Sequence, residues 1–292
     1  MPSKPSLSLI IPCLNEAEYL PRLLKDLTEQ TFTDFEVIVV DGNSDDQTKD
    51  KAQSFANKLS LKVLNTNKRN VAHQRNLGAK QAKSDWLIFM DADNSLSKTI
   101  LEDLMAKITK TKVDGFTTFI EPDSGNAKDK GIARMTNYSI YISAIINAPL
   151  CYGALLGVKR TSFEKLNGFD TTLKLSEDWD FSKRLAKNNL IFKCFPDISF
   201  TCSFRRLRKE GHFKMLKSTA LIHLNNIGNF IPTIDSDYPM LGGSYYEHMH
   251  REKQSILNQL SDVARETKKL TSKQQHSLKE FLKHVLDIEI KF

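Results

Sequence analysis

Residues 86–93 read WLIFMDAD, an uninterrupted apolar run that is followed by two aspartates. Two similar runs lie upstream, LSLIIP at residues 7–12 and FEVIVV at residues 35–40. Short apolar runs that do not alternate with polar residues are typical of strands buried on both faces. We therefore predict that these three segments are strands of one covered sheet.

The segments between these runs favour helices. Within residues 16–31, leucines recur at positions 20, 23, 24 and 27, which is the spacing of one helix face. Residues 45–59 and 70–83 are also predicted helices, with a short strand at 61–64 between them. Strand and helix alternate four times within about 90 residues, a pattern that predicts an α/β fold with a parallel sheet.

Acidic residues stand where two of the predicted strands end. Asp41 follows the second strand, and Asp91 and Asp93 follow the strand at 86–90. Ligands of parallel α/β sheets bind beyond the carboxyl ends of the strands. Carboxylates there can hold a hard cation such as Mg²⁺ or Mn²⁺, or accept hydrogen bonds from a nucleobase or ribose. Asp-x-Asp alone is also common in solvated turns, so the tripeptide leaves both interpretations open.

A third acidic segment reads SEDWD at residues 176–180, where a further helix is predicted to begin. Acidic side chains in a first turn are stabilised by the helix dipole, and this is the structural interpretation. A carboxylate that faces a cleft can instead act as a general base toward a hydroxyl group. The residues by themselves leave both interpretations open.

The rest of the chain is less regular. Strands are expected at 115–120, 153–159, 191–195 and 198–201, and helices at 132–148, 162–166 and 176–188. After Phe204 the pattern changes: an apolar helical stretch occupies 214–232, and helix formers dominate 247–291. We therefore expect a catalytic domain over residues 1–211 and a helical C-terminal region over residues 212–292.

Composition narrows the class of protein. The 292 residues are 40% hydrophobic and 26% charged, as in ordinary globular domains. The cysteines at positions 13, 151, 194 and 202 form no CxxC pair, which argues against a zinc ribbon and favours a reducing, cytoplasmic location. GxxxxGKS/T and GxGxxG are absent, which argues against P-loop NTPases and dinucleotide-binding dehydrogenases. No apolar run reaches the roughly 18 residues of a membrane span.

The net charge of +7 is concentrated toward the C-terminus. Residues 1–202 contain 27 basic and 25 acidic side chains, whereas residues 203–292 contain 15 and 10, so +5 of the +7 lies in the last third. Residues 205–209 alone contain four cations. Nucleic acid, a phosphate-bearing ligand and an anionic membrane are partners that such a charge attracts, and a solvated basic turn explains it equally well.

Six segments together resemble one family. They are PCLNE at 12–16, VDGNSDDQT at 40–48, AHQRNLGA at 72–79, FMDAD at 89–93, the stretch 153–170 with its KR and NGFD, and EDWDFSKRL at 177–185. In this order they resemble the motifs of glycosyltransferase family 2. The resemblance implies the GT-A fold, a Rossmann-like, mostly parallel sheet flanked by helices, here with a helical C-terminal appendage. It also implies transfer of a sugar from a nucleotide-diphosphate sugar.

The resemblance implies roles for individual residues. Asp178 would be the catalytic base, Glu177 beside it would be a second catalytic residue, and Asp93 would bind the metal, Mg²⁺ or Mn²⁺. Gly153 and Trp179 would contact the acceptor. The donor would be bound by Pro12, Asn15, Glu16, Asp41, Arg75, Asp91, Arg205 and Arg206, with Asp41 at the nucleobase and Asp91 at the ribose. Asp41-Gly42 stands where the family often has Asp-Asp-Gly, so base recognition departs from the common pattern.

We therefore expect an inverting, metal-dependent glycosyltransferase of the hexosyltransferase type that uses a UDP- or GDP-sugar. Its acceptor would be a glycan or a lipid-linked molecule of cell-envelope synthesis. A catalytically inactive nucleotide-sugar-binding or membrane-associated scaffold is the alternative. A nucleotidyltransferase would need a Gly-rich loop where PCLNE stands. Nucleic acid is not an expected partner, because the basic segment lacks interleaved aromatic residues. A homodimer and a peripheral contact with the cytoplasmic face of the membrane are left open.

Overall fold

The computed structural model describes residues 4–151, 153–173 and 176–210. Within them one sheet of seven strands has the spatial order β3-β2-β1-β4-β6-β5-β7. The strands are β1 (Leu7–Cys13), β2 (Phe35–Asp41), β3 (Leu61–Asn65), β4 (Trp86–Met90), β5 (Gly115–Pro122), β6 (Leu155–Lys159) and β7 (Phe192–Cys202). Every pairing is parallel except those of β6, which runs antiparallel to β4 and β5. The predicted α/β fold with a mostly parallel sheet is confirmed.

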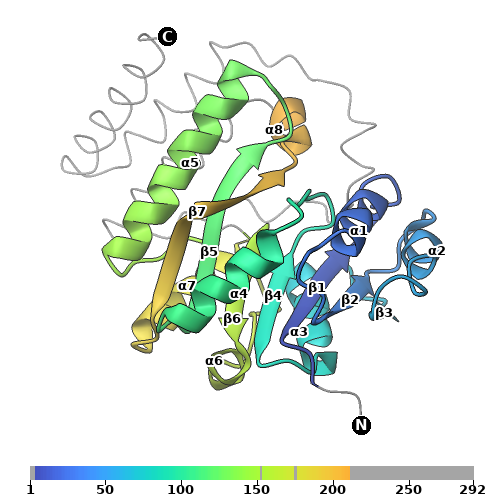
Figure 1. Ribbon diagram of the computed structural model, residues 1–292, viewed down its shortest axis with the longest axis horizontal. Coiled ribbons are helices and arrows are strands. Elements are labelled where there is room, and N and C mark those ends of the chain that lie inside the picture. Colours follow the sequence, from blue (N-terminus) through green and yellow to red (C-terminus); the bar gives the residue numbers. More distant parts are fainter. Residues whose placement is uncertain (1–3, 152, 174–175, 211–292) are drawn as a thin grey trace. The chain divides into compact units, whose positions relative to one another are not determined.

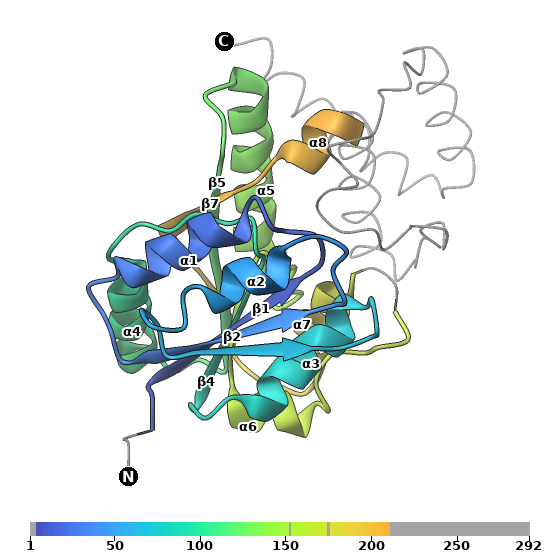
Figure 2. The same cartoon turned by 90° about the vertical axis from the view of Figure 1, so that its right-hand side faces the viewer.

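Helices cover the sheet (Figures 1 and 2). They are α1 (Leu20–Thr28), α2 (Thr48–Gln53), α3 (Val71–Gln81), α4 (Ile100–Lys110), α5 (Ala127–Ile145), α6 (Arg160–Lys165), α7 (Glu177–Lys187) and α8 (Arg205–Glu210). In the two views α1 and α4 lie on one face of the sheet, and α3 and α6 lie on the other. All residues of β1 and β2 are buried, which explains why most of them are apolar, and the polar pair Ser8 and Glu36 is joined by a hydrogen bond of 2.7 Å.

Several elements differ from the prediction; the helix expected at 132–148, for example, is α5 and begins at Ala127. α4 is missing from the predicted set, although its buried residues Ile100, Leu104 and Ile108 have helical spacing. The two predicted strands at 191–195 and 198–201 form the single strand β7, whose pairing with β5 shifts register between Thr118 and Phe119. The predicted helix at 45–59 is helical only over α2, because the chain turns after Gln53.

A second compact unit begins at Phe204, where the sequence pattern was expected to change, and α8 belongs to it. The helical segments predicted over 214–232 and 247–291 lie outside the described residues. The division into residues 1–211 and 212–292 therefore stays a prediction. None of the helices in the described part of the chain combines the length and the hydropathy that crossing a membrane requires.

Close packing of α3 on the sheet depends on a glycine. A Cβ atom at Gly78 would lie 2.5 Å from Cγ2 of Ile10 in β1 and 3.1 Å from Cγ2 of Val40 in β2. Both neighbours are fully buried and β-branched, so neither can move aside cheaply. This contact fixes the distance between α3, which carries Arg75, and the strands that carry the other candidate residues.

The substitution Gly78→Ala should destabilise the protein by about 1–3 kcal/mol, because overpacking outweighs the gain in helix propensity of about 1 kcal/mol. Gly131→Ala in α5 is the matched control, since a Cβ atom there meets nothing within 4 Å. It should stabilise the protein by about 0.5–1 kcal/mol. Urea unfolding of the two variants measures both effects, and equal stability of Gly78→Ala and the wild type would contradict the packing argument.

Candidate functional site

The candidate site lies at the carboxyl edge of β1, β2 and β4. These strands are neighbours and run parallel, with Cys13 paired to Asp41 at the ends of β1 and β2. The segments that follow them begin at Leu14, Gly42 and Asp91. Pro12, a predicted donor residue, is buried in β1 just before this edge. The structure thus brings three of the predicted motifs to one edge of the sheet.

Hydrogen bonds tie the loop after β1 to the loop after β2. The Asn15 side chain accepts a hydrogen bond from the Asp45 amide at 2.7 Å, and the Asn15 amide donates to Oγ of Ser44 at 2.9 Å. The Glu16 amide donates to Oγ1 of Thr48 at 2.8 Å. Asn15 has a φ of 54°, in the left-handed region that asparagine tolerates better than most residues. Asn15 and Glu16, two of the residues predicted to bind the sugar donor, therefore hold these two loops together.

Asp41 is buried and engaged within its own loop. One of its carboxylate oxygens accepts from the Ser44 amide at 3.1 Å, and the other accepts from Oγ of Ser44 at 2.5 Å. Beside Asp41, the Gln74 side chain of α3 bridges the ends of β1 and β2: it donates to the carbonyl oxygens of Cys13 and Val40, both at 2.8 Å. The predicted contact between Asp41 and a nucleobase stays a prediction. What the structure adds is its role in ordering the loop.

Arg75 joins the segments that carry the remaining candidates. Its guanidinium group donates to Oε1 of Glu177 at 2.5 Å, to Oδ1 of Asp91 at 2.9 Å and to the carbonyl oxygen of Gly153 at 3.1 Å. The guanidinium carbon also lies 5.5 Å from the centre of the Phe169 ring. The side chain is only 3% exposed. Arg75 thus links α3, the end of β4, the segment before β6 and the first turn of α7.

Gly153 is a glycine because Arg75 leaves no room for a side chain. A Cβ atom at this position would lie 2.5 Å from Nη2 of Arg75. The peptide groups on either side of Gly153 face opposite partners: its carbonyl oxygen accepts from Arg75, and its amide donates to Oδ2 of Asp178 at 2.5 Å. The predicted contact between Gly153 and an acceptor stays a prediction.

Asp178 has an unusual carboxyl group. Burial, together with the charge of the neighbouring Glu177, raises the pKa of Asp178 to about 7, although the Arg75 guanidinium and the Gly153 amide act in the opposite direction. Its other oxygen accepts from the Trp179 amide at 2.8 Å. Trp179 itself is half-buried in the first turn of α7. A pKa near neutral is suited to a group that accepts and releases a proton at physiological pH.

Oxygen donors follow β4. Asp91 and Asp93 are half-buried, and the next residue, Asn94, is 1% exposed. The side-chain nitrogen Nδ2 of Asn94 donates to the Ala154 carbonyl oxygen, and the side-chain oxygen Oδ1 of Asn94 has no hydrogen-bond partner among the described residues. Such a set of hard oxygen donors fits Mg²⁺ or Mn²⁺. No cluster of three or more His, Cys, Asp or Glu is found in the described part of the chain, so phosphate oxygens and water would have to complete the shell.

The predicted site residues fall into two groups. Most lie at the carboxyl edge or in the network around Arg75. Arg205 and Arg206 begin α8 in the second unit, so their role at the donor stays a prediction. Sequence reasoning missed Gln74 and Asn94, although Gln74 stands inside a recognised motif beside Arg75 and Asn94 directly follows the motif that ends at Asp93.

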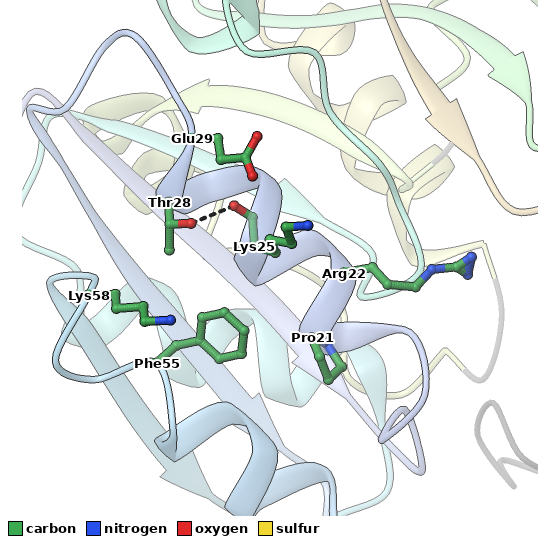
Figure 3. A pocket seen from close by; sticks show the side chains of 7 residues that line it. All are labelled: Pro21, Arg22, Lys25, Thr28, Glu29, Phe55 and Lys58. Atoms are coloured by element: carbon green, nitrogen blue, oxygen red, sulfur yellow. Dashed lines mark hydrogen bonds between the residues drawn. The ribbon is translucent and has the colours of Figure 1, made fainter.

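A separate hollow of about 570 Å³ lies between α1 and residues 55–58 (Figure 3). It is lined by Pro21, Arg22, Lys25, Thr28, Glu29, Phe55 and Lys58. None of these residues belongs to the predicted site. The hollow is therefore not the place where the motif residues converge.

Comparison with known proteins agrees with this geometry. The family model described as Glycosyl transferase family 2 matches residues 8–167, from β1 to the turn after α6. The chain belongs to glycosyl transferase family 2. The matched stretch includes Asp41, Arg75, Asp91, Asp93 and Gly153 and ends before Glu177 and Asp178, and the expected family resemblance is confirmed.

Curated relatives of this family 2 member match between 62% and 63% of its length. Poly(ribitol-phosphate) beta-N-acetylglucosaminyltransferase TarS of Staphylococcus aureus (strain Mu50 / ATCC 700699) is 31% identical over 188 residues, which are 62% of this chain and 32% of TarS. A PGL/p-HBAD biosynthesis glycosyltransferase of Mycobacterium bovis (strain BCG / Pasteur 1173P2) is 30% identical over 191 residues, which are 63% of this chain and 71% of that protein. The chain thus spans only about a third of the length of TarS.

Solved structures share the fold. The mannosyltransferase PcManGT from Pyrobaculum calidifontis, in complex with GDP-Man and Mn²⁺, has a TM-score of 0.64 at 20% identity and covers 98% of this chain and 81% of its own. S. aureus TarS 1–349 in complex with UDP-GlcNAc has a TM-score of 0.59 at 21% identity, over 94% and 79% of the two chains. The expected GT-A fold is confirmed by these matches.

The raised pKa of Asp178 has a consequence for stability. Between about pH 4 and pH 7 the folded protein binds a proton at Asp178 that the unfolded chain has lost, so this group makes stability fall as pH rises through that window. Asp178→Asn cannot ionise and should lack the fall. The melting temperature of the variant minus that of the wild type should therefore be larger at pH 8 than at pH 5. A difference that does not change with pH would contradict the raised pKa.

Proposed function

We propose that this chain transfers a sugar from a nucleoside-diphosphate sugar to a hydroxyl group, with inversion at the anomeric carbon. The observation that carries the proposal is Asp178: a carboxyl group with a pKa of about 7, held by the Gly153 amide in a network with Arg75, Glu177 and Asp91. Family membership supplies the class of reaction. The relatives support the donor class, since solved ones hold UDP-GlcNAc or GDP-Man.

In the proposed reaction Asp178 takes the proton of the acceptor hydroxyl as its oxygen attacks the anomeric carbon. The bond from that carbon to the diphosphate oxygen breaks, and the leaving nucleoside diphosphate takes the electron pair. Arg75 stays with Asp91 and Glu177, so it orients both sides of the site without itself gaining or losing a proton. A divalent cation held by Asp93 would neutralise charge on the leaving diphosphate.

The acceptor is proposed from chemistry shared by the relatives. TarS is named for a poly(ribitol-phosphate) acceptor, and the mycobacterial relatives are named for PGL/p-HBAD biosynthesis. The TarS name concerns a polymer, and a glycan or lipid-linked acceptor in cell-envelope synthesis is our proposal here. A binding protein without catalysis is the competing function, and it makes no use of an ionisable carboxyl group at residue 178.

Activity should depend on a divalent metal. A panel of UDP- and GDP-sugars, followed by release of the nucleoside diphosphate, should show turnover with Mn²⁺ or Mg²⁺ that chelation abolishes. Asp93→Asn should lower this turnover while leaving the fold intact, whereas Asp50→Asn on the exposed surface of α2 should leave it unchanged. Full turnover after chelation, or by Asp93→Asn without added metal, would refute the metal role.

Transfer should also depend on the ionisation of Asp178. Because the base must be deprotonated, the rate should rise with pH through about 7 and then level off. Asp178→Asn should lose about 10²–10⁴-fold in transfer rate, the usual contribution of a general base, and still bind the nucleotide sugar. Transfer by Asp178→Asn at the wild-type rate would reject the assignment, and lost donor binding would point to a binding role instead.

A further inference from the structure

The helix α5 has an unusual distribution of polar and apolar side chains between its buried and exposed faces. The helix packs along β5 and β7, yet the side chains that it buries are largely polar: Asp129, Thr136, Asn137, Ser139 and Ser143. Of its large apolar side chains Ile140 is buried as well, whereas Tyr138, Tyr141 and Ile145 are exposed. Among the described residues, the large hydrophobic side chains classed as exposed are Tyr138 (65%), Tyr141 (37%), Ile145 (62%), Ile146 (65%) and Ile191 (37%). Four of these five belong to α5 or follow it directly.

The buried polar face is well matched to its surroundings. The Asn137 side chain accepts a hydrogen bond from the Ile120 backbone amide at 2.8 Å and donates one to the Ile120 carbonyl oxygen at 2.9 Å, as the backbone of a neighbouring strand would. Oγ of Ser143 accepts from the Leu150 amide at 2.9 Å. These bonds fix the rotation of the helix, because turning it would leave buried polar groups unpaired. Tyr138, Tyr141 and Ile145 therefore stay on the outside.

The exposed residues form one stripe along the helix. Lys130, Arg134, Tyr138, Tyr141 and Ile145 are spaced by four, four, three and four positions, the spacing that places residues on one helix face. The stripe begins with two cations, continues with two tyrosines and ends with isoleucine. It contains no acid, since the only acidic residue of α5, Asp129, is fully buried and accepts from Oγ of Ser124.

The apolar end of the stripe continues into a hollow. Ile146 and Ile191 extend it beyond the helix, and a hollow of about 560 Å³ lies between the end of α5 and residues 189–194. Ala144, Leu190 and Lys193 are among the residues that line it. We call the stripe together with Ile146 and Ile191 the α5 outer face.

We propose that the α5 outer face binds the surface of a lipid bilayer that contains anionic lipids. Isoleucine side chains enter the acyl boundary, tyrosines lie at the headgroup level, and Lys130 and Arg134 meet lipid phosphates. Large apolar side chains gathered on one exposed surface mark an interaction site, and on this surface they lie in line with the two cations Lys130 and Arg134. The proposal uses residues outside the catalytic network and does not depend on the proposed reaction.

A second copy of the chain is a poorer occupant. A twofold contact between two such faces would bring cations against isoleucines or, where only the apolar ends meet, would make no use of the cations. A bilayer surface offers anionic groups and an apolar layer at different depths, which matches the order of side chains along the stripe. We therefore commit to the lipid surface, and dimerisation is an outcome of the test.

Co-sedimentation of the full chain with vesicles tests the proposal. The wild type should sediment with vesicles of phosphatidylcholine and phosphatidylglycerol in equal parts, and much less with phosphatidylcholine alone. Lys130→Gln with Arg134→Gln should weaken binding to the anionic vesicles by about thirtyfold, the effect of two cations at an anionic surface. Tyr138→Ser with Ile145→Ser should weaken it by about tenfold or more.

Lys25→Gln with Lys58→Gln is the matched control, because it removes the same charge from the exposed surface near the hollow of Figure 3. This control should bind vesicles like the wild type, and melting curves should show that every variant is folded. Wild-type binding by the Tyr138/Ile145 variant, equal losses in the control, or no wild-type sedimentation would each overturn the proposal. So would a dimer in solution that only the Tyr138/Ile145 variant dissolves.

Discussion

The buried guanidinium group of Arg75 is the interaction on which the candidate site depends. A charge that is 3% exposed is costly to bury unless partners surround it, and here two carboxylates and a carbonyl oxygen do so. Those partners come from the end of β4, from the segment before β6 and from α7. Their positions relative to one another therefore follow from one side chain, and Gly78 sets the depth at which α3 presents it.

The sequence was sufficient for the sheet because burial on both faces leaves a strong signal. LSLIIP, FEVIVV and WLIFM have no alternation, and all three are strands of the parallel part of the sheet. Signals that depend on partners were weaker. Residues 191–201 are one strand interrupted by an irregular pairing with β5, and the sequence alone divides them in two. The apolar stretch at 132–148 predicted a helix that overlaps α5, but it did not reveal that polar side chains of α5 face inward, since that depends on hydrogen bonds to Ile120 and Leu150.

The sequence predicted the individual residues of the site better than it predicted the contacts between them. The family motifs point to Asp91, Gly153 and Glu177 separately, and the structure places all three on Arg75. These contacts join residues separated in sequence by 16, 78 and 102 positions, so no local spacing rule reports them. Gln74 was missed for the same reason, because its partners are the backbone ends of β1 and β2.

The same network explains how one carboxylate near Arg75 can differ from another. Glu177 contacts the guanidinium directly, whereas Asp178 accepts from backbone amides and is separated from Arg75 by the Gly153 peptide. Glu177 then opposes the ionisation of Asp178 by its own charge, while burial removes the water that would otherwise stabilise the anion. A cation therefore stabilises the site as a whole and still leaves one carboxyl group with a pKa near neutral. Glu177, through its charge and its bond to Arg75, thus helps to set the environment in which Asp178 titrates.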